Sequence, residues 1–382
     1  MARVLFGCTA GFGHFLPLVP LARAFADAGH DVAFGAAEGS RKRVEAMGLE
    51  LLPVGLGIEE LSERFAPHRR LIEQLPPHER RPSSFRRRFG IVEAPVRLEG
   101  FRAAAAAWRP DLVIHESADL AAPIAAASLG LPSAQHSFGR VVPLAAWDAA
   151  AEETAALWES VGLEPEPLGG AFRGPYLDIV PPSFQSEPLP DGTRSQLLRP
   201  VFPADPDEQP PVWLDRLPDR PTVYVTLGTV FNDLSSFRLL LDALADVDCN
   251  VVATVGRDND PASLDPLPAN ATVERYVSQS LILPRAAAAV VHGGSGSTLA
   301  ALAAGLPLLI LPRGADQFEN AGQARAIGAG RMLMPDELTG DAVRDAVVAL
   351  LEDGSYRDAA RGVAAEIAAM PSPAEVVALL LS

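Results

Sequence analysis

The sequence predicts an α/β protein made of two doubly wound domains that face each other across a cleft. Short apolar runs typical of buried strands alternate with helical patterns of apolar residues, and glycine or proline turns separate them. This alternation occurs twice, on either side of a proline-rich stretch between about residues 164 and 221. The chain has 382 residues, of which 48% are hydrophobic, so it can build more than one core.

The first half begins with a βαβ unit. We expect a buried strand at residues 3–8, a helix from Pro17 to Ala26 that ends at Gly29, and a second strand at residues 30–34. A helix between two such strands joins parallel neighbours in one sheet. The same unit recurs as a strand at residues 111–115, a helix at 120–129 closed by Gly130, and a strand at 132–136.

The second half repeats this pattern after the proline-rich stretch, whose prolines break any long helix and mark the domain boundary. Its expected strands cover residues 222–227, 250–254, 288–292, 308–311 and 331–334. Open parallel sheets bind their ligands beyond the carboxyl ends of the strands. We therefore expect the functional residues at those ends, in the cleft between the two domains.

Composition excludes several classes of function. The chain has 32 basic and 48 acidic residues, a net charge of −16, which disfavours nucleic acid or an anionic membrane as a partner. Cys8 and Cys249 are too few and too far apart for a zinc site or a disulfide framework, which favours a reducing compartment. Lys42 is the only lysine and lies in a charged run, so Walker-type and Schiff-base chemistries are disfavoured. With no apolar run long enough for a membrane span and no signal peptide pattern, we expect a soluble, cytoplasmic protein.

One segment is locally basic in this acidic chain. We favour reading it as a solvated loop and helix face, with a gate that steers an anionic or polyphenolic acceptor as the alternative. Its arginines are Arg69, Arg70, Arg80, Arg81, Arg86, Arg87 and Arg88.

The strongest local motif ends a predicted strand at His292 and continues as Gly293-Gly294-Ser295-Gly296-Ser297-Thr298 into a helix that Gly305 stops. Glycines let the backbone approach an anion closely, and the free amides of a first helical turn lie at the positive end of the helix dipole. The hydroxyls of Ser297 and Thr298 add further donors. The motif predicts a phosphate-binding turn, and the alternative is an ordinary βα turn with serine caps.

Together with its surroundings, this motif carries a resemblance to a known family. The segment Tyr276–Ala321 contains Val277-Ser278-Gln279, the His292–Thr298 turn, Ala304-Gly305-Leu306-Pro307 and Asp316-Gln317-Phe318-Glu319-Asn320-Ala321. It resembles the nucleotide-sugar signature of the GT-B, family 1 glycosyltransferases, and most of all the bacterial enzymes that attach deoxysugars to antibiotic aglycones. Gly11-Phe12-Gly13-His14-Phe15-Leu16-Pro17-Leu18 resembles the acceptor-site turn of the same family.

The resemblance implies two Rossmann-like domains of the GT-B architecture. Residues 1–205 would bind the acceptor, residues 217–365 would bind the nucleotide sugar, and a C-terminal helix at residues 366–382 would pack back on the first domain. The nucleotide sugar is then a substrate, and neither a cofactor nor a metal is required, because a helix N-terminus can neutralise the departing diphosphate.

The resemblance also assigns roles to individual residues of the donor site. The diphosphate would be held by the turn and by one residue of the first strand of the second domain, namely His292, Gly293, Gly294, Ser295, Gly296, Ser297, Thr298 and Thr229. The backbone around Val277, with Gln279 in the same segment, would read the pyrimidine edge. Asp316 and Gln317 would bind hydroxyls of the transferred sugar.

Two departures from the family pattern concern the nucleoside. Tyr276 stands where many relatives have a tryptophan under the base, and Ala300 stands where enzymes that use UDP-sugars often have a glutamate that binds the ribose. A buried 2′-hydroxyl without a partner costs about 1–3 kcal/mol, or roughly a factor of ten to a hundred in affinity. We therefore expect a dTDP-sugar rather than a UDP-sugar as the donor.

His14 is the candidate catalytic base, and residue chemistry alone supports this interpretation. It follows a strand and a glycine turn, and an imidazole that titrates near neutrality can accept a proton from an attacking hydroxyl. Such a base needs a carboxylate on its other nitrogen. Glu116, directly after another predicted strand, is the first candidate, and Asp119 is the second. The alternative is that His14 is only a polar residue in a loop.

We therefore expect an inverting glycosyltransferase that moves a deoxysugar from a dTDP-sugar to a hydroxyl of a hydrophobic small-molecule aglycone, acting as a monomer or a homodimer. A nucleotide-sugar epimerase on the same fold is the first alternative. A non-catalytic helper of another glycosyltransferase is the second, and a Rossmann oxidoreductase is the third.

Overall fold

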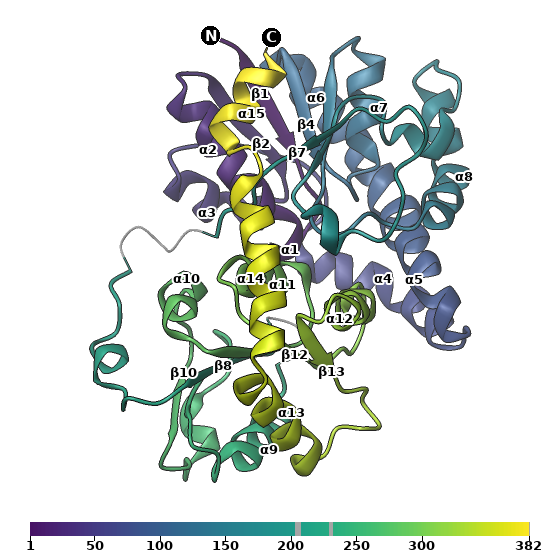
Figure 1. Ribbon diagram of the computed structural model, residues 1–382. Helices are drawn as coiled ribbons and strands as arrows, with labels where there is room; N and C mark the ends of the chain where they lie inside the picture. The colour runs from purple at the N-terminus through teal and green to yellow at the C-terminus, as the bar shows by residue number, and fades with distance from the viewer. Residues whose placement is uncertain (203–207, 229–231, 382) are drawn as a thin grey trace. The chain divides into compact units, whose positions relative to one another are not determined.

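The computed structural model describes residues 1–202, 208–228 and 232–381, without the side chains of residues 77 and 78. The chain folds into two compact units (Figure 1). The first consists of Met1–Val180, Glu187–Arg199 and the C-terminal residues from Met370 onward. The second consists of Pro181–Ser186 and Pro200–Ala369. Each unit contains one parallel sheet covered by helices, which confirms the predicted fold class.

The first unit is built on a seven-stranded sheet in which all neighbouring strands are parallel. In spatial order the strands are β3 (Glu50–Pro53), β2 (Asp31–Ala36), β1 (Arg3–Gly7), β4 (Leu112–Glu116), β5 (Ser133–His136), β6 (Tyr176–Asp178) and β7 (Ser195–Leu197). The direction of strand succession reverses between β1 and β4. This switch point is where an open α/β sheet binds its ligand.

Helices cover both faces of this sheet (Figure 1). Glycines at Gly7 and Gly35 let α6 approach the strands, since a Cβ at either position would lie 2.8 Å from the ring of Phe101. The helices are α1 (Phe12–Phe15), α2 (Val19–Asp27), α3 (Arg41–Ala46), α4 (Ile58–Glu73), α5 (Pro77–Phe85), the π-helix η3 (Arg86–Glu93), α6 (Ala94–Trp108), α7 (Ala121–Ser128) and α8 (Leu144–Ser160).

The second unit is built on a six-stranded parallel sheet with the same kind of strand order. In spatial order the strands are β10 (Ala271–Glu274), β9 (Asn250–Thr254), β8 (Thr222–Thr226), β11 (Ala288–Val291), β12 (Leu308–Ile310) and β13 (Gly330–Met332). Its switch point lies between β8 and β11. Its helices are α9 (Leu234–Leu244), α10 (Gln279–Ile282), α11 (Ser295–Ala303), α12 (Gln317–Ala326), α13 (Gly340–Glu352) and α14 (Gly354–Ala369).

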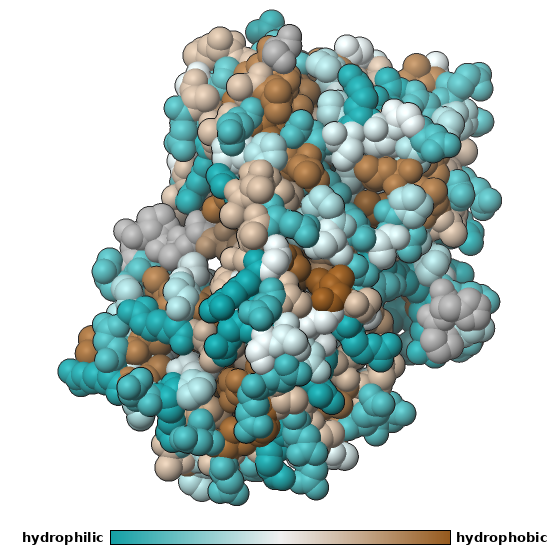
Figure 2. Space-filling view, viewed as in Figure 1, coloured by the Kyte–Doolittle hydropathy of each residue, from teal (hydrophilic) through white to brown (hydrophobic). Residues whose placement is uncertain are grey.

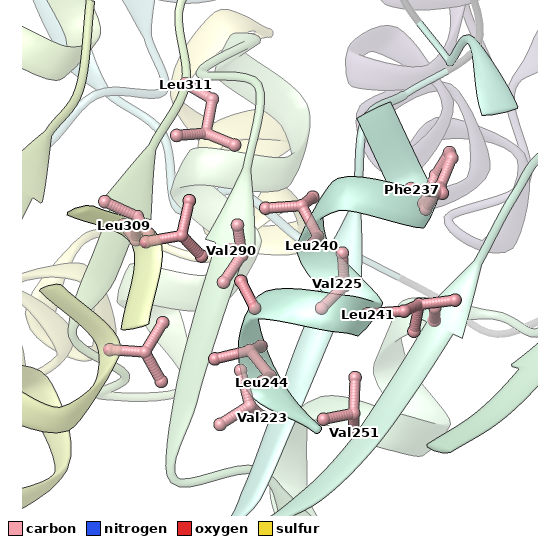
Figure 3. Packing of buried hydrophobic residues seen from close by; sticks show 14 of the residues in the cluster. Val223, Val225, Phe237, Leu240, Leu241, Leu244, Val251, Val290, Leu309 and Leu311 are labelled. Atoms are coloured by element: carbon pink, nitrogen blue, oxygen red, sulfur yellow. The ribbon is translucent and has the colours of Figure 1, made fainter. Parts of the chain in front are cut away.

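The core of the second unit fixes the strands that carry the predicted donor site. Phe237, Leu240 and Leu244 of α9 pack against valines of β8 and β11 (Figure 3). All of these side chains are fully buried. Each buried side chain of this size contributes about 1.5–3 kcal/mol, so the ends of β8 and β11 are held in place by packing.

Two expectations about the chain's organisation need correction. The proline-rich stretch contains β6 and β7, which extend the first sheet, so it is more than a boundary between domains. We also expected one helix over residues 366–382, but α14 continues to Ala369 and Pro371 and Ser372 interrupt the chain. A new helix, α15 (Pro373–Leu380), begins with a capping box between Ser372 and Glu375 and packs on α2 of the first unit.

Hydrophobic residues on the face shown in Figure 2 form separate patches among hydrophilic ones. Among the described residues, no single helix is both long and apolar enough to cross a bilayer. The pair α14 and α15 passes this test only when taken together, with a bend of 41° at the break.

Candidate functional site

His14 is placed by the turn that follows β1. Gly11 has a φ of 128°, a backbone conformation that favours glycine, and its carbonyl oxygen accepts hydrogen bonds from the backbone N–H groups of His14 (3.3 Å) and Phe15 (3.2 Å). This glycine starts the short helix α1, and His14 lies on that helix. The imidazole is therefore held just beyond the carboxyl end of β1, at the switch point of the first sheet.

Glu116 reaches the same place from β4. In the parallel register Gly7 is opposite His115, so Glu116 lies beside the residues that follow Gly7. Its Oε1 atom accepts hydrogen bonds from the N–H (3.3 Å) and hydroxyl (2.7 Å) of Thr9, and its Oε2 atom accepts one from the N–H of Ala118 (2.5 Å). The Nδ1 atom of His14 is 3.2 Å from Oε1. Among the described residues this nitrogen has no well-aligned hydrogen bond, so the contact with Glu116 is an electrostatic one.

The charge of Glu116 is secured by its surroundings. Burial raises the pKa of this fully buried carboxyl, but the nearby His14 and the hydrogen bonds from Thr9 and Ala118 lower it to about 2. The group therefore remains a carboxylate at every pH at which an imidazole is neutral. A permanent negative charge beside Nδ1 is what a histidine general base needs, because it stabilises the imidazolium that forms when the base accepts a proton.

Asp119, the second candidate partner of His14, is bound to other groups. Its carboxylate forms a buried ion pair with Arg97 at 2.5 Å and accepts a hydrogen bond from the N–H of Ala122 in the first turn of α7. Arg97 also donates to the carbonyl oxygens of Val54 and Gly35. Asp119 thus fastens α6 to α7 and the sheet, and Glu116 is the acid beside His14.

Several neighbours of His14 were missed from the sequence. The ring of Phe138 lies 4.8 Å from the imidazole, and the ring of Phe89 lies 5.4 Å away at an angle of 61°. Arg88 and the buried Glu93 belong to the same π-helix as Phe89. The only sequence signal for these neighbours of His14 was the run of arginines, which we interpreted as a solvated surface.

The predicted phosphate-binding turn follows β11, next to β8. A Cβ at Gly228, just after β8, would lie 2.6 Å from Cε1 of His292, and one at Gly294 would lie 2.5 Å from its Nε2. Both positions therefore require glycine for the imidazole to fit between them. Burial lowers the pKa of His292 to about 4, so its imidazole is neutral at physiological pH.

The start of α11 has the features of an anion-binding helix terminus. Its N-cap is Gly294, and among the described residues no side chain caps its first turn. The hydroxyl of Ser297 donates to the carbonyl oxygen of Gly294, and the buried hydroxyl of Thr298 has no partner in the described part of the chain. This contradicts the reading as a serine-capped turn, because neither hydroxyl satisfies the free amides.

Asp316 and Gln317 lie next to this turn, and the side chains of both already accept hydrogen bonds. Asp316 Oδ2 accepts hydrogen bonds from the hydroxyl of Ser295 (2.6 Å) and from the side-chain amide of Asn320 (3.0 Å). Gln317 Oε1 accepts from the backbone N–H groups of Arg313 (2.7 Å) and Gly314 (3.1 Å). The described hydrogen bonds leave Asp316 Oδ1 and the Gln317 amide nitrogen for a ligand.

The predicted base-binding segment follows β10. Tyr276 is 45% exposed, and the guanidinium of Arg257 lies 3.7 Å from the centre of its ring, so one face of the ring is already covered. Val277 is buried, and Gln279 begins α10. The N–H of Ser278 donates to Glu208 at 2.8 Å, a contact that the sequence did not predict.

Two further donor-site residues complete the comparison with the sequence. Ala300 is buried within α11, the helix whose first turn is the candidate anion site. Thr229 lies outside the described residues. In the described part of the chain no three His, Cys, Asp or Glu side chains are grouped so that they could hold a metal ion.

Comparison with known proteins identifies the family of the chain. Residues 23–228 match the family described as erythromycin biosynthesis protein CIII-like, N-terminal domain, and residues 238–382 match its C-terminal domain. The chain is 34% identical to an L-demethylnoviosyl transferase of Streptomyces niveus, with 98% of this chain and 96% of the relative covered. It is 31% identical to a 3-alpha-mycarosylerythronolide B desosaminyl transferase of Saccharopolyspora erythraea, with 99% and 97% covered.

Solved structures of glycosyltransferases have the same fold. SnogD from Streptomyces nogalater superimposes with a TM-score of 0.82 at 31% identity, covering 100% of this chain and 98% of that one. SsfS6 of Streptomyces sp. SF2575, complexed with thymidine diphosphate, gives a TM-score of 0.81 at 28% identity, covering 100% and 99%. The chain therefore belongs to the erythromycin biosynthesis protein CIII-like family and is a nucleotide-sugar-dependent hexosyltransferase of the GT-B, family 1 natural-product glycosyltransferases.

Proposed function

We propose that this enzyme transfers a deoxysugar from a dTDP-sugar to a hydroxyl of a hydrophobic natural-product aglycone, with inversion at the anomeric carbon and His14 as the general base. The observation that carries the proposal is the contact of 3.2 Å between His14 Nδ1 and the buried, ionised Glu116. A carboxylate in this position keeps the proton of the neutral imidazole on Nδ1, so that Nε2 is the atom that accepts a proton.

In the proposed reaction the acceptor hydroxyl loses its proton to Nε2 of His14 as its oxygen attacks the anomeric carbon. The new C–O bond forms while the bond from that carbon to the diphosphate oxygen breaks, and dTDP leaves from the opposite face of the sugar. Glu116 stabilises the imidazolium produced in this step. The aromatic rings of Phe89 and Phe138 beside the base suit a hydrophobic aglycone.

The leaving diphosphate would be stabilised by the first turn of α11. Its backbone N–H groups and the positive end of the helix dipole favour the charge that develops on the departing oxygen. Neutral His292 can donate a hydrogen bond to the same group. Thymidine diphosphate in the related SsfS6 supports a dTDP donor. The buried Ala300 supports it too, because alanine offers no acceptor for a ribose 2′-hydroxyl.

Calorimetric titration with dTDP, dUDP and UDP tests the donor. The pair UDP and dUDP isolates the 2′-hydroxyl, and the pair dUDP and dTDP isolates the methyl group. We expect UDP to bind about 10- to 100-fold more weakly than dUDP. Ala300→Glu should narrow this difference, whereas Ala304→Glu, at an exposed position just past α11, should not. Equal affinity for UDP and dUDP would refute the preference, and no binding of any nucleotide would favour the non-catalytic helper.

Turnover tests the base. With dTDP-deoxysugars and a panel of hydrophobic aglycones, we expect mass spectrometry to detect glycosides and NMR to show the opposite anomeric configuration from the donor. His14→Ala should lower turnover by about 10²-fold or more while dTDP affinity stays the same. Full turnover by His14→Ala would remove the base assignment. Donor consumption without any aglycone would indicate an epimerase.

A further inference from the structure

Arg88 connects the π-helix η3 to the turn that carries His14. Its Nη2 atom donates a hydrogen bond of 2.8 Å to the carbonyl oxygen of Ala10, the residue before Gly11. The two residues are far apart in sequence, so this bond ties η3 to the end of β1 by a tertiary contact. The same guanidinium lies near Gly11, since a Cβ built there would be 4.0 Å from Nη2.

The guanidinium is itself held from two directions. Its Nε atom donates to Oε1 of the buried Glu93 at 3.1 Å, and its central carbon lies 4.8 Å above the ring of Phe89. Phe89 in turn packs against the His14 imidazole in an edge-to-face arrangement. Arg88 therefore reaches His14 by two routes, through the backbone of the turn and through an aromatic ring.

The π-helix explains why Arg88 and Glu93 can pair. They are five residues apart, and in an α-helix with about 3.6 residues per turn such residues point roughly 140° away from each other. The wider i→i+5 turn of a π-helix brings them onto one face. The irregular segment thus has a structural consequence, because it aims Arg88 at Ala10 while Glu93 holds its other side.

Neighbouring arginines make different contacts. Arg86 binds Glu153 of α8, and Arg87 contacts Ser83 at 3.1 Å and His68 at 3.4 Å. Neither has a described bond to the turn of His14. The chain therefore supplies a control for Arg88 at the adjacent position of the same helix.

We propose that Arg88 is a positioning residue for the catalytic base. By holding the Ala10 carbonyl against the π-helix, it fixes the glycine turn and with it the place of the His14 imidazole. This inference rests on the proposed role of His14. The expected cost of its loss follows from geometry, since displacement of a catalytic group by about 1 Å can lower a rate about 10²-fold.

The test compares Arg88→Ala, Arg88→Lys and the control Arg87→Ala. We expect Arg88→Ala to lower kcat about 10- to 100-fold and to leave the KM for the dTDP-sugar within about twofold of the native value. Arg88→Lys keeps one cationic group but cannot reach both Ala10 and Glu93 with a planar fork, so its kcat should be intermediate. Because the side chain is 26% exposed, millimolar guanidinium chloride should partly restore kcat in Arg88→Ala, whereas sodium chloride of equal ionic strength should not.

Hydrogen–deuterium exchange provides a readout that does not depend on turnover. The amides of His14 and Phe15, which donate to Gly11, should exchange faster in Arg88→Ala than in the native protein or in Arg87→Ala. Native kcat and native exchange in Arg88→Ala would overturn the inference, as would an equal loss in Arg87→Ala. If Arg88→Ala does not fold, a fully native Arg88→Lys would overturn it. Absence of transfer by the native protein would instead refute the proposed function, and exchange would still report whether Arg88 holds the turn.

Discussion

Replacement of Glu116 by glutamine removes the charge beside His14 while keeping nearly the same shape. The native carboxylate accepts three hydrogen bonds from Thr9 and Ala118 and lies 3.2 Å from His14 Nδ1. A glutamine has only one acceptor oxygen. If its amide nitrogen takes the place of Oε2, it opposes the N–H of Ala118, and a buried donor left without a partner costs about 1–3 kcal/mol of stability.

The opposite orientation of the glutamine is worse for catalysis. Its amide would then donate toward His14 Nδ1, which favours the tautomer with the proton on Nε2, and that tautomer cannot accept the acceptor's proton there. In either orientation the imidazolium loses its counter-charge. We therefore expect kcat of Glu116→Gln to fall by about 10²-fold or more, toward the drop of about 10⁴-fold known for a histidine base that loses its orienting carboxylate.

The assay separates this effect from a general loss of structure. kcat and KM are measured for an accepted aglycone, dTDP binding is measured by calorimetry, and unfolding is followed by circular dichroism. We expect dTDP affinity to be unchanged, since the proposed donor-binding residues lie in the second unit. Glu116→Asp should retain part of the activity because it keeps the charge. A folded Glu116→Gln enzyme with native kcat would refute the reasoning.

Two further predictions concern the donor turn. The affinity for dTDP-glucose, measured by calorimetry, should rise several-fold as the pH falls from about 7 to 5. The pKa of His292 is about 4 in the free protein, and a bound diphosphate favours protonation of this imidazole. In His292→Asn the affinity should no longer depend on pH in this way. Without ligand, the contribution of His292 to the free energy of unfolding should decrease as the pH falls from about 6.5 toward 4, since this imidazole is protonated in the unfolded chain before it is protonated in the folded one. Gly294→Ala should weaken dTDP binding about tenfold or more, because its Cβ would lie 2.5 Å from His292. In the control Gly362→Ala the new Cβ would have no described neighbour within 4 Å beyond the backbone of its own helix, so dTDP affinity should stay unchanged and the free energy of unfolding should rise by about 0.5–1 kcal/mol. Equal dTDP affinity in the two variants would contradict the steric argument.

Much of the fold could be predicted from local pattern because its central strands are continuous apolar runs. Of the strands next to the candidate site, β1, β8 and β11 fall within expected runs, and β4 extends one residue beyond its expected run, to Glu116. The strands that were missed, β3, β6, β7 and β10, have only three or four residues each, and β6 follows Pro175 directly. Such segments form strands because a neighbouring strand offers hydrogen bonds, which periodicity cannot reveal.

In the candidate site, too, positions at strand ends could be predicted from local pattern, whereas contacts between distant segments could not. The positions of His14, Glu116 and His292 at strand ends could be predicted, because His14 and His292 follow β1 and β11, Glu116 ends β4, and a parallel sheet brings strand ends together. The partner of Asp119 could not be predicted, since Arg97 is 22 residues away in sequence and lies on α6. Arg88 was misread for a further reason: its pairing with Glu93 depends on a π-helix, and patterns of 3.6 residues place these two side chains on different faces.

Each unit places its chemistry at the same topological position, and the residues there decide what that position does. After β8 and β11 the chain has Gly228 and Gly294, and the absence of side chains leaves the start of α11 open to an anion. His14 follows β1 and Glu116 ends β4, and Glu116 gives this place a fixed negative charge that suits proton transfer and repels a phosphate. A diphosphate is therefore favoured at one switch point and disfavoured at the other, which supports the proposed assignment of the donor to the second unit and of the base to the first.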